Sequence, residues 1–234
     1  MRVLAVLLCS VAQAWTVKAN VEKTIFLGPH PVPLPLPNAR PSLDSLALHT
    51  LSPSKLILPV QLPLQFPSAS QPRGLDSWYL VQGLQEGKRY EVRVCWPATQ
   101  PTDFWLDTFP ITHVLDTPDL ISSLARYSDQ AQFLKDQLEP HKEHTYDTPD
   151  SLLFLRIQAA GSYYSTNRTL MDFPPPVHAD IILDPFILNI FPQSLAAFAI
   201  YVSAVAVGAW FLSGFIYRWL IVVAAEGSPK PHID

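Results

Sequence analysis

Hydrophobic and polar residues alternate with a period of two in the middle of the chain, which is typical of β-strands. In the segment YEVRVCW (residues 90–96), aromatic and valine side chains share one face, and Glu91, Arg93 and Cys95 share the other. This alternation predicts a strand with one buried face. Residues 78–81 and 103–109 are predicted as strands too, and we expect 103–109 to pair with 90–96 across the turn at 97–101.

Three further extended segments are predicted on either side of this region. Residues 151–159 and 177–183 have the composition of strands. Residues 55–66 alternate prolines with Leu, Ile and Val. Because proline cannot donate to a sheet ladder, this segment is expected as an edge strand or as an extended segment laid over a sheet.

A helical period occurs in residues 117–138. Thr117 is suited to cap a helix, Pro118 to its first position and Asp119 to the positive end of its dipole. Apolar residues then recur at spacings of three and four, at Leu120, Leu124, Tyr127, Ala131, Leu134 and Leu138. Pro140 is expected to end this amphipathic helix, which should cover an edge or face of the sheet.

The residues before the clearest strand suggest a fold class. The spacing of Leu84, Gly87 and Tyr90 resembles the tyrosine corner of immunoglobulin-like sandwiches, in which the hydroxyl bonds a nearby backbone group. We therefore expect the Tyr90 hydroxyl to bond the backbone near Leu84. The predicted fold is mainly β: an immunoglobulin-like β-sandwich with one amphipathic helix, plus a C-terminal transmembrane helix.

The C-terminal region predicts this membrane span. Residues 187–217 contain no charged side chain, and residues 195–217 would form a helix of about 34 Å, enough to cross a bilayer. Arg218 and Lys230 follow the span, whereas the nearest charges before it are acidic, so the C-terminus is expected in the cytosol. Residues 219–225 stay apolar, and the helix either continues there or lies in the interface.

The N-terminus predicts a signal peptide. Residues 3–11 are mostly apolar and precede Ala12-Gln13-Ala14, a pattern that signal peptidase accepts. Cleavage is expected after Ala14, with Ala19 as the alternative. The alternative to a signal peptide is a buried N-terminal strand or helix. A signal peptide and the charges beside the span together predict a single-pass type I protein with a lumenal N-terminal domain.

These features divide the chain into five parts. They are a signal peptide (1–14), a Pro-rich extended segment with the first strands (15–76), the core of the β-sandwich (77–186), the transmembrane helix (195–217) and a cytosolic tail (218–234). The second part is extended because 11 of the 24 prolines lie in residues 29–72.

Charge and cysteine content limit the classes of partner and of covalent bond that the chain can have. The net charge of −4 and the lack of a basic cluster argue against nucleic acid as a partner. Cys9 would leave with the signal peptide, so Cys95 could form no intrachain disulfide. We expect Cys95 to be a small core residue in a strand; the alternative is a bridge to a partner chain.

The sequence contains few candidates for catalytic, metal-binding or modified residues. Asn167-Arg168-Thr169 is an acceptor site for N-glycosylation and is expected at the surface. His141 and His144 have a spacing used in metal sites, but they follow Pro140 in a polar stretch that fits a solvated linker better. Asp103 and Asp107 would share a strand face as a carboxylate pair for sugar chemistry, but solvated carboxylates are the better interpretation. No catalytic, cofactor-binding or metal-binding residue is predicted.

A domain of this kind, held by one helix, is expected to work by binding. Two pairs of small residues in the predicted span are spaced by four and would let another helix approach closely: Ala204 with Gly208, and Ala209 with Ser213.

The chain resembles the fungal accessory subunits, or co-activators, of GPI mannosyltransferase II. The resemblance lies in VEKTIFLGP (21–29), in YEVRVCWPATQPTDFWLD (90–107) and in residues 167–186, which lead into the membrane helix, and it covers nearly the whole length. It implies a glycosylated, non-catalytic subunit of the endoplasmic reticulum (ER) membrane. Its partner would be the multi-spanning mannosyltransferase that adds the second mannose in GPI-anchor biosynthesis. The resemblance carries no functional residues over.

Three other functions stay open. An accessory subunit of GPI mannosyltransferase I would share the layout of a β-domain on one helix. A type I cell-surface binding module would reside in the plasma membrane with mature glycans. A lumenal hydrolase would depend on Asp103 or Asp107.

Overall fold

The computed structural model describes residues 20–32, 46, 48–135 and 151–226. Several predictions lie outside these residues: the signal peptide, most of the alternating prolines, the end of the amphipathic helix at Pro140, His141 and His144, and residues 227–234. The described strands are β1 (Val21–Leu27), β2 (His49–Leu51), β3 (Ile57–Leu62), β4 (Leu75–Val81), β5 (Arg89–Cys95), β6 (Thr102–Pro110), β7 (Leu153–Gly161), β8 (Val177–Ile187) and β9 (Phe191–Pro192).

The helices are fewer and lie mainly after β6. They are α2 (Ile111–Asp116), α3 (Pro118–Lys135), α4 (Arg168–Asp172), the 3-10 helix η2 (Gln193–Leu195) and α5 (Ala196–Glu226). The predicted amphipathic helix is confirmed as α3. The short helices α2 and α4 were not predicted, because helices of five or six residues are too short to establish a period. The hydroxyl of Thr117, expected to cap α3, donates to the carbonyl of His113 in α2 at 2.8 Å.

The strands form two sheets. Sheet A has the order β1-β5-β8-β3, with β9 paired to β8, and sheet C has the order β2-β4-β7-β6. All pairs are antiparallel except β2 with β4, which is parallel. The chain is therefore mainly β, with two sheets and one long apolar C-terminal helix, as predicted at this level.

The two sheets enclose the larger of two hydrophobic clusters. Tyr90, Val92 and Val94 of β5 face Leu155 and Ile157 of β7 across this cluster, and all five side chains are buried. The face predicted from the alternation in residues 90–96 is therefore the core face. The predicted bond of the Tyr90 hydroxyl to the backbone near Leu84 is confirmed, because the backbone N–H of Gln85 donates to this hydroxyl at 3.0 Å.

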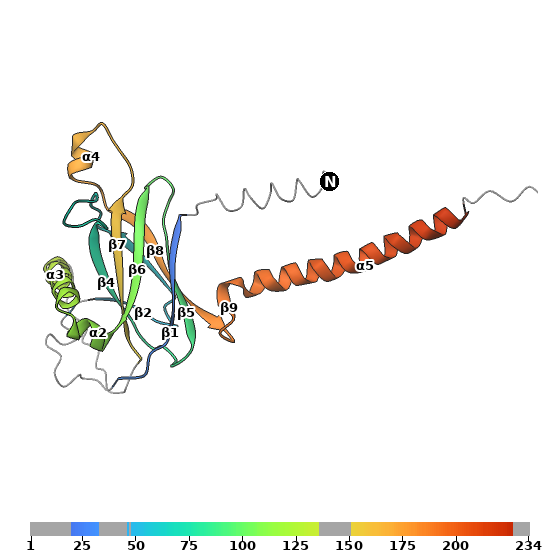
Figure 1. Ribbon diagram of the computed structural model, residues 1–234, viewed down its shortest axis with the longest axis horizontal. Helices are drawn as coiled ribbons and strands as arrows, with labels where there is room; N and C mark the ends of the chain where they lie inside the picture. Colours follow the sequence, from blue (N-terminus) through green and yellow to red (C-terminus); the bar gives the residue numbers. More distant parts are fainter. Residues whose placement is uncertain (1–19, 33–45, 47, 136–150, 227–234) are drawn as a thin grey trace, which may run out of the picture.

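The second cluster lies between the outer face of sheet C and the helices α2 and α3. Trp78 and Phe154 of the sheet pack there with Leu120 and Leu124 of α3, which confirms that the helix covers a sheet face (Figure 1). The Trp78 indole also donates to the hydroxyl of Ser123 on α3 at 3.1 Å. Residues 78–81 form an uninterrupted apolar run because both faces of β4 are covered.

The predicted pairing of residues 90–96 with 103–109 is wrong. β5 pairs with β1 and β8 in sheet A, whereas β6 pairs with β7 in sheet C. Residues 96–101 thus cross from one sheet to the other and do not form a hairpin turn. Pro97 and Pro101 lie in this connection, and neither can donate a backbone hydrogen bond.

Three other predictions can be compared with the structure. Residues 57–62 form an edge strand, β3, as one of the two expectations had it, and Pro59 is accommodated at that edge. The apolar C-terminal segment is helical to Glu226, so the helix continues past Arg218. Cys95 lies in a strand as expected, but on the partly exposed outer face of sheet A and not in the core.

Candidate interaction site

The outer face of sheet A is the side of the sandwich that α2 and α3 leave uncovered, and α5 departs from this side (Figure 1). Its two edge strands carry exposed apolar side chains: Val21, Ile25 and Leu27 on β1 and Ile57 on β3. Between these edges, β5 and β8 carry charged side chains. Exposed apolar side chains gathered along the edges of an uncovered sheet can mark a protein interaction surface.

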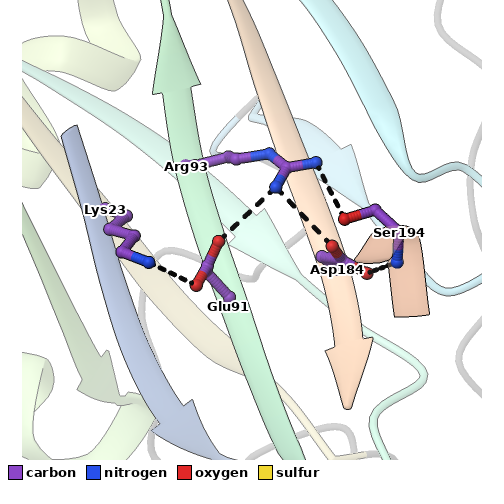
Figure 2. Close-up of polar contacts among 5 residues, drawn as sticks. All are labelled: Lys23, Glu91, Arg93, Asp184 and Ser194. Carbon is purple, nitrogen blue, oxygen red and sulfur yellow. Dashed lines mark hydrogen bonds and ion pairs between the residues drawn. The ribbon is translucent and has the colours of Figure 1, made fainter. Parts of the chain in front are cut away.

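A polar network crosses the centre of this face (Figure 2). Glu91 of β5 lies opposite Asp184 of β8 in the strand register, and both carboxylates are almost completely buried. Like charges at directly opposite positions destabilise a sheet unless a cation lies between them. Arg93 supplies that cation: its Nη1 atom lies 3.6 Å from Glu91 Oε1 and 3.7 Å from Asp184 Oδ2.

Two further residues complete the network. Lys23 of β1 donates to Glu91 Oε2 at 3.1 Å. Ser194 of η2 donates its backbone N–H to Asp184 Oδ1 at 3.2 Å, and its hydroxyl accepts from Arg93 Nη2 at 3.3 Å. The network therefore joins three strands of sheet A to the residues immediately before α5, and it positions the start of that helix on the sheet.

The network is not arranged for acid–base chemistry. Each buried carboxylate has a basic side chain within 4 Å, and Arg93 is shared between the two. Among the described residues, no group of three or more His, Cys, Asp and Glu side chains could hold a metal ion. The contacts are those of a structural junction.

The carboxylates considered for catalysis are not part of this network. Asp103 and Asp107 belong to β6 in the other sheet. Arg156 of β7 lies opposite Asp107 in the register and donates to it at 2.6 Å. The Arg156 guanidinium also lies 5.2 Å from the centre of the Phe109 ring. Asp107 is therefore held in a cross-strand ion pair, which accounts for its position without a catalytic role.

The predicted glycosylation residue is exposed at the start of α4. The Asn167 side-chain oxygen accepts from the backbone N–H of Thr169 at 3.0 Å, so Asn167 also caps this short helix. The structure places the residue in a capping turn but does not test whether it carries a glycan.

The small residues of the predicted span lie on the uncovered surface of α5. Ala204, Gly208, Ala209 and Ser213 are all exposed, and a Cβ atom at Gly208 would meet no other atom within 4 Å. α5 is part of one continuous apolar helical segment, Gln193–Ala225, that is long enough to cross a membrane and has none of its surface buried.

Sequence reasoning did not find the polar network. Glu91 and Arg93 were assigned to the face opposite the core, which is correct, but nothing in one strand shows that a carboxylate 93 positions later lies opposite Glu91. The signal that could have helped is Asp184, an acidic residue in an apolar segment next to the membrane helix.

Two comparisons with known proteins agree with each other. The sequence model described as Pga1, GPI-mannosyltransferase II co-activator, matches residues 76–209. The chain is also similar to a protein of Schizosaccharomyces pombe named as a GPI mannosyltransferase 2 subunit, with 23% identity over 128 residues, 55% of this chain. That match spans 48% of the relative, so the chain spans about half the length of the curated protein it matches. No solved structure matches the chain.

Proposed function

The chain belongs to the GPI-mannosyltransferase II co-activator family, and from this membership we propose that it is a non-catalytic ER membrane subunit that supports GPI mannosyltransferase II. It would need no cofactor. The partner would be the polytopic catalytic subunit, which adds the second mannose in GPI-anchor biosynthesis. The structural observation that supports the proposal is the layout of the chain: a sandwich whose polar network ends just before an uncovered apolar helix.

The proposed topology is single-pass type I. α5 would span the bilayer among lipids, the sandwich would lie in the lumen, and residues after the helix would lie in the cytosol. Arg218 and Lys230 support this orientation, since basic residues favour the cytosolic side. A glycan on Asn167 would require the same orientation, because N-glycosylation takes place in the lumen.

Two surfaces are proposed to contact the catalytic subunit. In the membrane, the small residues of α5 would allow a helix of the partner to approach closely. In the lumen, the apolar rim of sheet A would pack against the partner's loops. The polar network would hold these two surfaces in a fixed relation, since Ser194 links the sheet to the start of the helix.

We further infer that the sandwich is immunoglobulin-like. Strands β4, β7 and β6 follow the order of strands B, E and D in that fold, and β5 pairs with β8 as strand C pairs with F. The edges differ, because β1 and β3 flank β5 and β8 and because β2 joins β4 in parallel. Tyr90 lies on β5, the counterpart of strand C, whereas the tyrosine corner of that fold lies at the start of strand F. A crystal structure that placed β5 and β6 in one sheet would refute this assignment.

Deletion of the chain in its own host tests the function. The expected result is a GPI intermediate with one mannose, and re-expression of the wild-type chain should remove it. An intermediate without mannose would assign the chain to GPI mannosyltransferase I instead. Normal GPI assembly together with mature glycans on the chain would favour a cell-surface binding module.

Point variants test the two contact surfaces through co-purification of the catalytic subunit. Gly208→Leu should reduce co-purification, with Val207→Leu on the same helix as the matched control. Ile25→Asp on the rim of sheet A should do the same, with Phe133→Asp on α3 as the control on the other side of the sandwich. Equal effects of variant and control would contradict the assignment of that surface.

A further inference from the structure

The tip of the hairpin formed by β8 and β9 carries two apolar side chains that the described part of the chain leaves uncovered. Leu188 is 84% exposed and Ile190 is 70% exposed. The N–H of Ile190 donates to the carbonyl of Ile187 at 3.0 Å and closes a tight turn. Its central residues, Leu188 and Asn189, have φ angles of 52° and 58°. Asn and Gly are favoured there, so a leucine at the first position has no basis in the turn itself.

The hairpin is fixed to the body of the sandwich. Asn189 donates from Nδ2 to the carbonyl of Gly87 at 3.0 Å, and its Oδ1 accepts from the N–H of Arg89 at 2.8 Å. These bonds join the hairpin to the turn between β4 and β5, and an open depression of about 570 Å³ lies between the two. Leu188 and Ile190 are therefore presented from an anchored turn and not from a loose loop.

The hairpin also lies beside the start of the membrane helix. Ile190 is six residues before Ala196, where α5 begins, and Figure 1 shows β9 next to the departing helix. α5 has 31 residues and so a length of about 46 Å, well beyond the roughly 30 Å of a hydrocarbon core. The first turns of α5 can therefore lie at the level of the lipid headgroups, beside the β8–β9 hairpin.

Charged side chains flank the tip. Arg89 is exposed, and its guanidinium lies 5.8 Å from the ring centre of Phe186; Lys88 is part-buried beside it. Glu86, on the same depression, is paired with His30. Cationic side chains beside exposed apolar side chains suit the boundary between lipid phosphates and acyl chains.

We propose that Leu188 and Ile190 insert into the headgroup–acyl boundary of the leaflet on the sandwich side. The hairpin is then a second membrane contact next to α5. A single helix would let the sandwich tilt and rotate over the membrane, whereas two contacts fix its orientation and hold the outer face of sheet A at a constant height. The inference rests on the proposed span by α5.

Fluorescence quenching tests the insertion in the full-length chain. The variant used carries Cys9→Ser and Cys95→Ser and is reconstituted in phosphatidylcholine vesicles. One cysteine is then introduced at a chosen position and labelled with an environment-sensitive dye. The cysteine replaces Leu188 or Ile190 at the tip, Leu212 within α5, or Tyr164 near α4 as the matched control. Tyr164 is as exposed as Leu188 and precedes α4 by four residues, and Figure 1 shows α4 at the end of the sandwich away from β9. Quenchers are a lipid with a nitroxide near its headgroup and aqueous iodide.

The expected result is quenching of the dyes at 188 and 190 by the nitroxide lipid and at least fivefold weaker quenching by iodide than at 164. Iodide quenching of 188 and 190 equal to that of 164, with 212 still shielded, overturns the hairpin contact and leaves the span intact. Iodide quenching of 212 refutes the span, and the hairpin contact with it. Shielding of 188 that appears only with the catalytic subunit present identifies a protein contact and also overturns the proposal.

A second variant separates lipid contact from turn stability. Leu188→Asn suits the positive φ of the turn, so the fold is preserved while an apolar side chain is lost. With the dye at 190, this variant should show at least twofold weaker quenching by the nitroxide lipid. Unchanged quenching would mean that Leu188 does not enter the membrane.

Discussion

Asp184 on β8 accepts a hydrogen bond from the backbone N–H of Ser194 at 3.2 Å, ten residues further along the chain. Between them the chain turns through the β8–β9 hairpin and enters η2. The bond fixes the direction in which the chain leaves the sheet, because Ser194 lies only two residues before α5. A buried carboxylate in the sandwich thus positions the start of an apolar helix, together with the hydrogen bond from Arg93 to the Ser194 hydroxyl.

Removal of Arg93 should destabilise the fold. In Arg93→Met, Glu91 and Asp184 lie opposite each other without the cation that they share. Breaking a buried ion pair typically costs about 3–5 kcal/mol, and the lower end is expected because Arg93 is about a quarter exposed. The matched variant Lys23→Met breaks a pair whose lysine is mostly exposed and should cost less than about 1 kcal/mol.

Urea unfolding of the full chain in detergent, followed by tryptophan fluorescence, measures both losses. The double variant Arg93→Met/Asp184→Asn should recover part of the loss, since it removes one of the two facing charges. Equal losses for Arg93→Met and Lys23→Met would contradict the role given to Arg93.

The hydrogen bond to the Tyr90 hydroxyl should contribute a small and separable stabilisation. Tyr90→Phe removes the hydroxyl that accepts from Gln85 but keeps the ring that stacks on Phe26 at 5.8 Å. The N–H of Gln85 loses its partner in a part-buried hydrogen bond, so the expected loss is about 0.5–1.5 kcal/mol. Tyr164→Phe, on an exposed ring, is the control and should leave the urea midpoint unchanged.

The sequence carried enough local information to predict most strands. The alternation in residues 90–96, the spacing from Leu84 to Tyr90 and the apolar stripe of α3 each depend on neighbouring residues, and the structure confirms all three. The apolar stretch that became α5 is the same kind of signal.

What could not be predicted depends on contacts between distant segments. The sequence of residues 96–101 is compatible with a hairpin turn and with a crossover between sheets. Only the pairing of β5 with β8 decides between the two. The polar network could not be predicted for the same reason, because Glu91 and Asp184 face each other only in one register of two strands that are far apart in the chain. β1 was missed as a strand because its edge position leaves most of its residues exposed.

Two glycines with similar backbone angles should respond differently to alanine. Gly74 and Gly87 have φ angles of +74° and +69°. At Gly87 a Cβ atom meets nothing within 4 Å, so Gly87→Ala should cost only the backbone strain, about 1–2 kcal/mol. At Gly74 a Cβ atom would lie 1.9 Å from the carbonyl oxygen of Ala159, so a loss above about 4 kcal/mol is expected.

Thermal unfolding of the two variants provides the comparison. Gly74→Ala should fail to fold or unfold far below the wild type, whereas Gly87→Ala should show a small decrease in Tm. Similar Tm values for both variants would mean that β4 and β7 do not approach as closely as described.

The reactivity of Cys95 should depend on pH in a defined direction. Burial raises the pKa of its thiol, the Arg93 guanidinium opposes the rise, and the Asp180 carboxylate adds to it. The thiolate is the reactive form, so alkylation by iodoacetamide should reach half its maximal rate at a higher pH than in the urea-unfolded chain. The folded chain keeps the proton longer, so this group's contribution to stability is complete below about pH 8.5 and declines as pH rises further.

Asp180→Asn is the matched variant for this measurement, since Asp180 is exposed on the same face. Loss of its negative charge should lower the pKa of Cys95 and shift the alkylation curve toward lower pH. The experiment uses a Cys9→Ser background so that only the thiol of Cys95 is alkylated. A shift in the opposite direction would contradict the assigned electrostatics.

Two substitutions separate the two roles of Asn167. Asn167→Gln removes both the glycosylation site and the side-chain bond to the N–H of Thr169, whereas Thr169→Ala removes the site but keeps that backbone bond. If the sandwich is lumenal, both variants should lose a glycosidase-sensitive shift in electrophoretic mobility, and Thr169→Ser should retain it. Only Asn167→Gln should also loosen α4, measured as faster amide exchange in residues 168–172, because loss of a helix cap costs about 1 kcal/mol. A wild-type chain without this glycan when made in its own host would count against a lumenal sandwich.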